Sequence, residues 1–145
     1  MKKISGGALI TKILIQNGIN KAFCVPGESY LGVLEAIRES KNKFDLVVCR
    51  HEGGAAYMAE AYGRLTQMPG ICFVTRGPGA CNASIGVHTA YQEGTPLILF
   101  VGQVPVKFLK KNAFQSIDTD KFFNSMAKYT ETIKDPRNCL LYTSD

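Results

Sequence analysis

The sequence has no long hydrophobic run of the kind that a membrane-spanning helix requires. Of its 145 residues 46% are hydrophobic, but they never form an uninterrupted stretch of about 18 residues. Residues 1–7 (MKKISGG) are basic at first and then small and polar, which is not the pattern of a signal peptide. The composition is neither collagen-like nor that of a small disulfide-framed protein, and the length fits one domain. We therefore expect a single soluble, cytoplasmic domain.

The chain also lacks the common motifs of metal, redox and nucleophilic sites. Its five cysteines and two histidines include no Cys-x-x-Cys pair and no His at metal-ligand spacing. Neither a zinc site nor a redox dithiol is therefore indicated. Cys24, Cys49 and Cys72 lie in apolar runs, and we expect them to be small buried side chains. Ser29 is not part of a Gly-x-Ser-x-Gly elbow, so a hydrolase triad has little support.

A glycine-rich segment does not complete either of two familiar nucleotide-binding motifs. Residues 77–82 (GPGACN) lack the third glycine of the dinucleotide fingerprint, and they follow the third predicted strand instead of the first. The lysine and the Ser or Thr of a phosphate-binding P-loop are absent as well. A nicotinamide cofactor is therefore not favoured.

Positive charge is concentrated in the last third of the chain. Seventeen Lys and Arg against twelve Asp and Glu leave a formal charge of +5. No nucleic-acid motif accompanies the lysines, so a solvated basic face is favoured over a nucleic-acid surface. The lysines concerned are Lys107, Lys110, Lys111, Lys121, Lys128 and Lys134.

Hydrophobic periodicity alternates between helices and short apolar strands. Strands are expected over residues 22–25, 45–49, 71–75 and 97–101, with a last one over 129–133. Helices are expected over residues 5–17, 30–40, 52–65, from about 80 to 91, and from a cap at Asp118 or Thr119 to Met126. Uniformly apolar strands must be covered on both faces. The prediction is an α/β fold with a doubly wound, mostly parallel sheet flanked by helices on both faces.

The unusual residues of the sequence come directly after the predicted strands. Residues 26–28 (PGE) follow the first strand, residues 50–52 (RHE) the second, residues 76–79 (RGPG) the third, and Gln103 the fourth. In open parallel sheets, ligands bind outside the carboxyl ends of the strands. We therefore expect the functional site at this edge of the sheet.

Glu52 lies in the most specific of these segments. Taken alone, it is more simply explained as an acidic residue that a helix dipole stabilises. Residues 50–64 (RHEGGAAYMAEAYGR), however, resemble the signature of thiamine diphosphate enzymes in their pyrimidine-binding domain. Segments in the order and spacing of that family accompany it: 25–28 (VPGE), 75–82 (TRGPGACN), 95–105 (TPLILFVGQVP) and 113–115 (AFQ). The resemblance covers residues 4–138 and is closest to acetolactate synthase large (catalytic) subunits.

The resemblance implies thiamine diphosphate as the cofactor and assigns roles to individual residues. The glutamate that matches Glu52 hydrogen-bonds a pyrimidine ring nitrogen and favours the imino tautomer, which takes the proton from the thiazolium carbon. Gln115 is the second expected catalytic residue. The other expected cofactor-binding residues are Pro26, Gly27, Gly77, Gly79 and Asn82, although plain turn chemistry explains these glycines equally well. The expected substrate pocket consists of Glu28, Arg76, Phe114 and Gln115.

Three residues depart from the pattern of acetolactate synthases. Glu28 stands where a second glycine is usual, Arg76 replaces the commoner serine, and Ser116 stands where a glutamate normally follows the glutamine. Each departure bears on the precise activity, and none affects Glu52.

The resemblance also implies that the chain is the first domain of a larger enzyme. That parent would decarboxylate and join 2-oxo acids as a homodimer or tetramer, with Mg²⁺ bound by a domain outside this chain and FAD as an optional further cofactor. No metal ligand, nucleic acid or membrane is expected for the chain itself. Residues 1–138 would be the pyrimidine-binding domain, truncated at its C-terminal end and inactive alone, and residues 139–145 a non-native tail. The alternative is a non-catalytic α/β binding module with a degenerate cofactor site.

Overall fold

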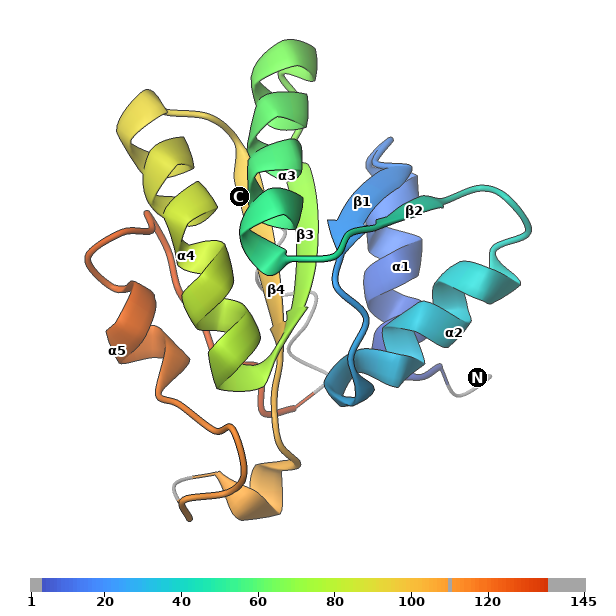
Figure 1. The fold of residues 1–145 in the computed structure, drawn as a ribbon. Helices are drawn as coiled ribbons and strands as arrows, with labels where there is room; N and C mark the ends of the chain where they lie inside the picture. Colours follow the sequence, from blue (N-terminus) through green and yellow to red (C-terminus); the bar gives the residue numbers. More distant parts are fainter. Residues whose placement is uncertain (1–3, 110, 136–145) are drawn as a thin grey trace.

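Four parallel strands form one sheet at the centre of the protein (Figure 1). The computed structural model describes residues 4–109 and 111–135. Across the sheet the order is β2 (Asp45–Val48), β1 (Lys21–Cys24), β3 (Gly70–Thr75) and β4 (Leu97–Gly102). Every pairing between neighbouring strands is parallel, which confirms the predicted α/β class.

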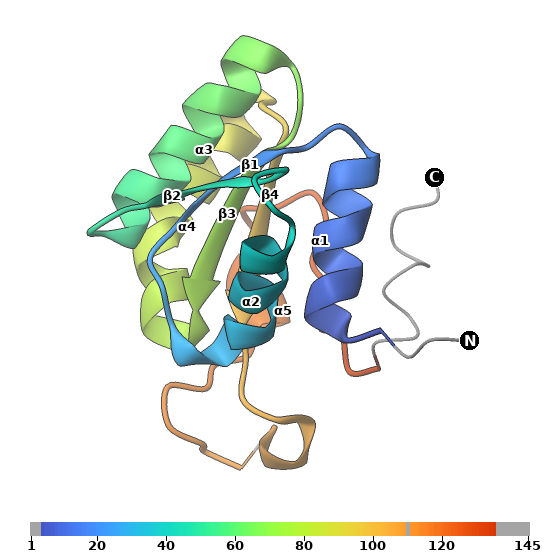
Figure 2. The same cartoon turned by 90° about the vertical axis from the view of Figure 1, so that its right-hand side faces the viewer.

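Helices cover both faces of this sheet (Figure 2). α1 (Gly6–Gln16) and α2 (Leu31–Glu39) lie on one face, and α3 (Glu52–Thr66) and α4 (Arg76–Glu93) lie on the other. α5 (Thr119–Phe123) packs beside α4, and η1 (Glu28–Tyr30) and η2 (Val106–Phe108) are short 3-10 turns. This is the doubly wound arrangement that the sequence predicts.

The central strand β3 sends its side chains alternately into two hydrophobic layers. On the α1–α2 face, Phe73 stacks between Tyr30 and Phe100, with ring centroids 5.9 and 4.8 Å apart. Cys72 and Val74 face the other way, into the layer that α3 completes. Burial on both faces explains why β3 has no polar residue before Thr75 at its end.

The small residues of α3 pack against α4 within the chain. A Cβ on Gly86 of α4 would lie 2.6 Å from the Cβ of Ala56, so no side chain fits at residue 86. Gly53, Ala55 and Ala56 are buried, whereas Gly54 is exposed. Small residues such as these allow close helix packing either within a chain or across a subunit interface. Three of the four pack within the chain.

One predicted strand is absent from the described residues. Residues 129–133 combine aromatic and β-branched side chains, but no described strand pairs with them, and they have no regular secondary structure. β-propensity produces a strand only where a neighbouring strand supplies hydrogen-bond partners. The prediction of a last strand over this segment is therefore wrong.

Two helix boundaries also differ from the prediction. α4 begins at Arg76 and not near residue 80, so residues 77–79 (GPG) form its first turn. Proline is tolerated there because the first N–H groups of a helix need no partner within the helix. α5 ends at Phe123, three residues before the predicted end at Met126. The predicted domain end at residue 138 and the tail over 139–145 lie outside the described residues.

The sheet has its topological switch point between β1 and β3. From β1 the chain passes through α2 to β2 on one side, and from β2 it returns through α3 to β3 on the other side of β1. The carboxyl ends of β1 and β3 therefore flank the position where open α/β sheets bind ligands. The segments that follow these two strands, together with Glu52 after β2, are among those that the sequence assigns to the site.

Candidate functional site

The loop after β1 is hydrogen-bonded to the last residue of β3 at the switch point. Gly27 is extended, and a Cβ on it would lie 2.5 Å from the Cβ of Thr75 at the end of β3. The hydroxyl oxygens of Ser29 and Thr75 form a hydrogen bond of 2.6 Å. Pro26 is exposed beside them. Gly27 is thus required for packing within the chain, and the exposed Pro26 edge of this loop is the part left for a ligand.

Glu52 is the first residue of α3 and lies against the start of α4. His51 caps the helix, since its Nδ1 accepts a hydrogen bond from the N–H of Gly53 over 3.0 Å. The side chain of Glu52 is half-buried, and Asn82 Nδ2 donates to its Oε2 over 2.9 Å. The structure therefore brings Glu52 and Asn82, two of the predicted site residues, into direct contact.

The second carboxylate oxygen of Glu52 is open to a ligand. Oε1 accepts no hydrogen bond from the described residues and lies 3.7 Å from where a Cβ on Gly79 would be. The absent side chain of Gly79 thus leaves space in front of Oε1. A half-buried carboxyl oxygen can share a proton with a ring nitrogen. These residues fit the pyrimidine group that the sequence predicts as their partner.

The segment with Phe114 and Gln115 is bonded to the first turn of α4. The N–H of Gly77 donates to the carbonyl oxygen of Gln115 over 2.7 Å, and a Cβ on Gly77 would lie 2.8 Å from that oxygen. Gln115 has a left-handed φ of 62°, and Phe114 is 78% exposed. The structure therefore brings Gln115 beside Gly77, where the glycine is explained by contact with the Gln115 backbone.

Arg76 and Glu28 follow β3 and β1, at the two sides of the switch point. Arg76 is half-buried and has a left-handed φ of 45°, and its Nη1 lies 3.5 Å from the carbonyl oxygen of Phe114. Its Nε is buried and has no hydrogen-bond partner in the part of the chain that the structure describes. Glu28 opens η1 and is exposed. Two charged groups thus stand at this edge of the sheet without an ion pair to a described residue.

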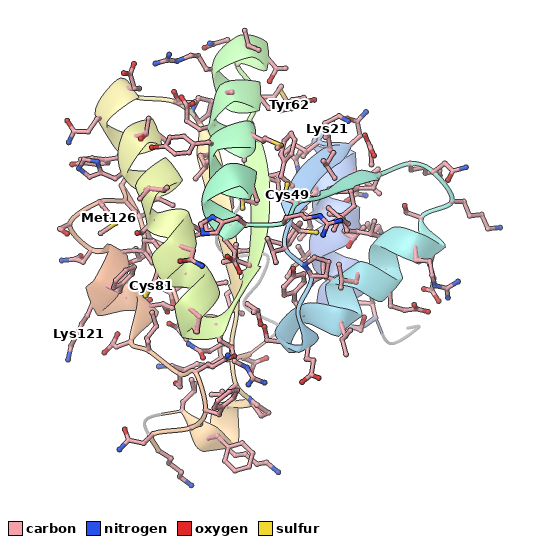
Figure 3. The ribbon with its side chains drawn as sticks, in the orientation of Figure 1. Lys21, Cys49, Tyr62, Cys81, Lys121 and Met126 are labelled. Atoms are coloured by element: carbon pink, nitrogen blue, oxygen red, sulfur yellow. The ribbon has the colours of Figure 1, made fainter. Side chains whose placement is uncertain are left out.

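The groups buried beneath the site are held in their protonated forms. Burial raises the pKa of the Cys72 thiol to about 12, and the neighbouring thiols and Glu52 add to this shift. Burial likewise raises the pKa of Cys24 to about 11 and that of the Tyr30 hydroxyl above its ordinary range. Cys24 and Cys72 confirm the predicted burial, whereas Cys49 is only half-buried at the end of β2 (Figure 3).

A metal site and a membrane-spanning helix, two features that the sequence analysis considered, are absent from the described residues. Across residues 4–109 and 111–135, no three His, Cys, Asp or Glu side chains are placed to hold a metal ion. No helix in these ranges is long and apolar enough to cross a membrane. Lys121 extends from α5 into solvent (Figure 3). The exposed lysines of the last third are Lys107, Lys111, Lys121, Lys128 and Lys134, while Lys110 lies outside the described residues.

Known proteins resemble this chain over nearly its whole length. The sequence pattern of the thiamine pyrophosphate enzyme N-terminal TPP binding domain matches residues 4–122. The chain is 36% identical to the acetolactate synthase of Bacillus subtilis over 136 residues, which is 94% of the chain and 24% of that protein. It is 35% identical to the mitochondrial acetolactate synthase catalytic subunit of Saccharomyces cerevisiae over 131 residues, 90% of the chain and 19% of that protein.

A third relative gives the same proportions. The acetolactate synthase isozyme 3 large subunit of Escherichia coli is 34% identical over 134 residues, which is 92% of the chain and 23% of that protein. The chain thus spans about a fifth to a quarter of the length of the curated relatives it matches.

Proposed function

The chain belongs to the thiamine pyrophosphate enzyme family, as the N-terminal TPP-binding domain, and from this premise we propose that it forms the pyrimidine half of a catalytic site. The full-length protein would be an acetolactate synthase-like enzyme that decarboxylates 2-oxo acids and joins the remaining fragment to an acceptor. When bound, thiamine diphosphate supplies the nucleophilic thiazolium carbon and the electron sink for that reaction.

One observation supports the proposal above the others: the contact between Glu52 and Asn82. Asn82 holds Oε2 over 2.9 Å, which leaves Oε1 directed at the space that Gly79 keeps open. In the proposed site, Oε1 shares a proton with the pyrimidine ring nitrogen. A closed, water-poor site strengthens that hydrogen bond, because the local dielectric constant falls when a partner domain covers the half-buried carboxylate.

The other predicted residues line the same centre in this proposal. Pro26, Gly27, Gly77 and Gly79 supply the backbone surface against the pyrimidine ring, and Gly27 and Gly77 also serve packing within the chain. Gln115 offers a polar contact to the substrate. Phe114 is exposed here and would be covered when substrate binds between two domains. Glu28 and Arg76 add charge to the substrate side.

The finer features of the enzyme belong to the proposal as well. Mg²⁺ would bind the diphosphate through a domain outside this chain, and FAD is an optional component of the full-length protein. Residues 1–138 would be the pyrimidine-binding domain and residues 139–145 a non-native tail. The enzyme would work in the cytoplasm.

A second copy of the protein would complete the site, because the outer face of α3 and α4 carries exposed apolar side chains. Tyr57, Met58 and Ile85 are 44%, 47% and 49% exposed on this face. Such an apolar face on two adjacent helices is typical of a subunit interface. We therefore expect a homodimer, or a tetramer built from dimers.

The deciding experiment substitutes Glu52→Gln in the full-length protein, with Glu39→Gln as the matched control. Glu39 is exposed at the end of α2 and far from the switch point in the fold. The amide at residue 52 keeps the shape and loses the titratable oxygen, so 2-oxo acid turnover should fall about 100- to 10,000-fold. Cofactor binding, followed by calorimetry with Mg²⁺, should be retained within about tenfold.

Two results would contradict the proposal. If Glu52→Gln and Glu39→Gln had the same turnover as the unsubstituted protein, Glu52 would have no catalytic role. If the unsubstituted full-length protein bound no thiamine diphosphate, the chain would instead be a non-catalytic α/β binding module with a degenerate site.

A further inference from the structure

Arg76 is held in a costly backbone conformation at the junction of β3 and α4. Its φ of 45° lies in the left-handed region, which a residue with a Cβ occupies only where the surrounding structure enforces it. The hydrogen bond from Gly77 to Gln115 fixes the residue that follows Arg76. The backbone of Arg76 is therefore fixed at the edge of the sheet that also carries Glu28 and Gly79.

The guanidinium lacks an anionic partner within the described chain. Nη1 has one long contact of 3.5 Å with the carbonyl oxygen of Phe114, and the buried Nε has no acceptor. Buried N–H groups without an acceptor are rare, because each forfeits the free energy of a lost hydrogen bond. Arginine presents a planar fork of donors that suits a carboxylate. Arg76 thus lacks the kind of acceptor that an anionic ligand provides.

The chemistry of decarboxylation restricts which carboxylate this can be. In that step the bond between the carboxylate carbon and the 2-oxo carbon breaks, its electron pair stays on the former 2-oxo carbon, and neutral CO₂ leaves. A guanidinium bound to the departing carboxylate would stabilise the substrate more than the transition state and would slow the reaction. A fixed cation is useful only for a carboxylate that keeps its charge throughout.

We propose that Arg76 makes this site specific for substrates with a carboxylate that survives the reaction. The inference rests on the proposed function and names its substrate class. Two sources supply such a group: the carboxylate of an acceptor 2-oxo acid, or the distal carboxylate of a dicarboxylic donor. In both, the surviving carboxylate accepts from the guanidinium of Arg76 and replaces the long contact between Nη1 and Phe114.

The test compares the full-length protein with Arg76→Gln, Arg76→Lys and the charge-matched control Lys111→Gln, an exposed lysine outside the strand-end contacts. Two pairs of substrates are compared, and in each pair only the first member has the surviving carboxylate. The acceptor pair is pyruvate and acetaldehyde, and the donor pair is 2-oxoglutarate and 2-oxobutyrate. Arg76→Gln should lower kcat/KM about 10- to 100-fold for the charged member of one pair. The neutral or singly charged member should change less than about twofold, and Arg76→Lys should recover part of the loss. The affected pair identifies the source of the carboxylate.

A binding measurement gives a readout that does not depend on turnover. Glutarate and butyrate, titrated calorimetrically into the cofactor-loaded protein, resemble the two sources but do not react. Arg76→Gln should weaken glutarate binding, or that of both acids, about tenfold or more. The inference is overturned if affinity for both acids is unchanged, or if Arg76→Gln lowers turnover of all four substrates equally. If the protein binds glutarate through Arg76 but Glu52→Gln leaves turnover unaffected, the carboxylate site stands and the proposed role of Glu52 fails.

Discussion

Asn82 acts on the proposed centre through Glu52, because its amide holds Oε2 and so directs Oε1. Asn82→Ala should lower turnover about tenfold, since the remaining carboxylate then samples several rotamers.

A positioning role is distinguished from a structural one by Asn82→Asp, which places a second negative charge beside Glu52. Like charges raise a carboxyl pKa, so the acidic limb of the pH–rate profile should move to higher pH. Asn124→Ala, at an exposed asparagine after α5, is the control. An unshifted profile for Asn82→Asp would contradict the role.

The buried thiols predict a loss of stability at alkaline pH. The pKa values of Cys24 and Cys72 are raised in the folded protein, to about 11 and about 12, from 9.0. Their stabilising contribution is therefore complete below pH 9 and is lost as the pH rises through 9 toward 12, because only the unfolded chain releases these protons. The slope should be about −1.4 kcal/mol per pH unit for each thiol. Urea titrations between pH 8 and about 11 measure it.

A control variant isolates one of the two thiols. Cys72→Ala should make the alkaline slope of the unfolding free energy against pH shallower by about 1.4 kcal/mol per pH unit, the contribution of one thiol. Cys81→Ala, at an exposed cysteine of α4, should leave the slope unchanged. Equal slopes for Cys72→Ala and the unsubstituted protein would show that the Cys72 thiol ionises freely in the folded state.

At the residue scale, the sequence predicts which residues belong to the candidate site better than it predicts their backbone conformations. Glu52 and Asn82 are recognised from their motifs, and the structure places them in contact. The left-handed backbone at Arg76 and Gln115 was not predicted, because neither residue type favours that region and tertiary contacts impose it. The hydrogen bond between Ser29, which follows β1, and Thr75, the last residue of the neighbouring β3, is not predicted by the sequence either.

At the scale of elements, substitutions at the C-terminal ends of α3 and α4 should change stability in opposite directions. The C-cap residue of α3 is Gln67, with φ 58°, and that of α4 is Gly94, with φ 68°. Gly94→Ala should destabilise the fold by about 1 kcal/mol, because a Cβ is strained in this region although no atom lies within 4 Å of it. Gln67→Gly relieves the same strain and should stabilise by up to about 1 kcal/mol, less the lost hydrogen bond to Arg64. Urea midpoints at constant slope measure both, and equal signs would contradict the argument.

The strands and helices were predictable to within a few residues, apart from two segments. The four strands of the sheet are short apolar runs bounded by turns, so period and composition identify them. The start of α4 was placed late because Gly and Pro normally signal a turn, whereas here they fill a first helical turn. Residues 129–133 have strand composition but do not belong to the described sheet. Local pattern contains no information on whether a pairing partner is present.

At the scale of the whole molecule, the apolar face of α3 and α4 predicts that association is sensitive to charge. Ile85→Glu would bury an unpaired carboxylate at the proposed interface and should weaken dimerisation more than about 100-fold. Leu31→Glu places the same charge on α2, on the opposite face of the sheet, at a leucine that is 60% exposed. Sedimentation velocity of the full-length protein at micromolar concentration should show monomer for Ile85→Glu and dimer for Leu31→Glu. A dimer unaffected by Ile85→Glu would place the interface elsewhere.

The strand order β2-β1-β3-β4 was not available from the sequence, although the doubly wound class was. The strand order depends on the side to which each crossover connection carries the chain, and the hydrophobic periodicity of the sequence does not indicate that side. The order nevertheless determines the site, since only adjacency of β1 and β3 brings Gly27 against Thr75. The motifs predict that these segments lie at one edge of the sheet, and the topology determines which of them meet.

The 145-residue chain expressed alone should neither turn over 2-oxo acids nor bind thiamine diphosphate tightly. It spans 24% of the Bacillus subtilis relative, and the proposal assigns the diphosphate and its Mg²⁺ to a domain outside it. In the chain alone, Glu52 is only half-buried, so water competes for Oε1 and weakens the proton-sharing hydrogen bond. Calorimetry with cofactor and Mg²⁺, and a pyruvate assay, would compare the chain with the full-length protein. We expect binding and turnover for the full-length protein only. Tight binding with turnover by the chain alone would show that its own residues hold the diphosphate, and the centre would then have to be placed elsewhere in the fold.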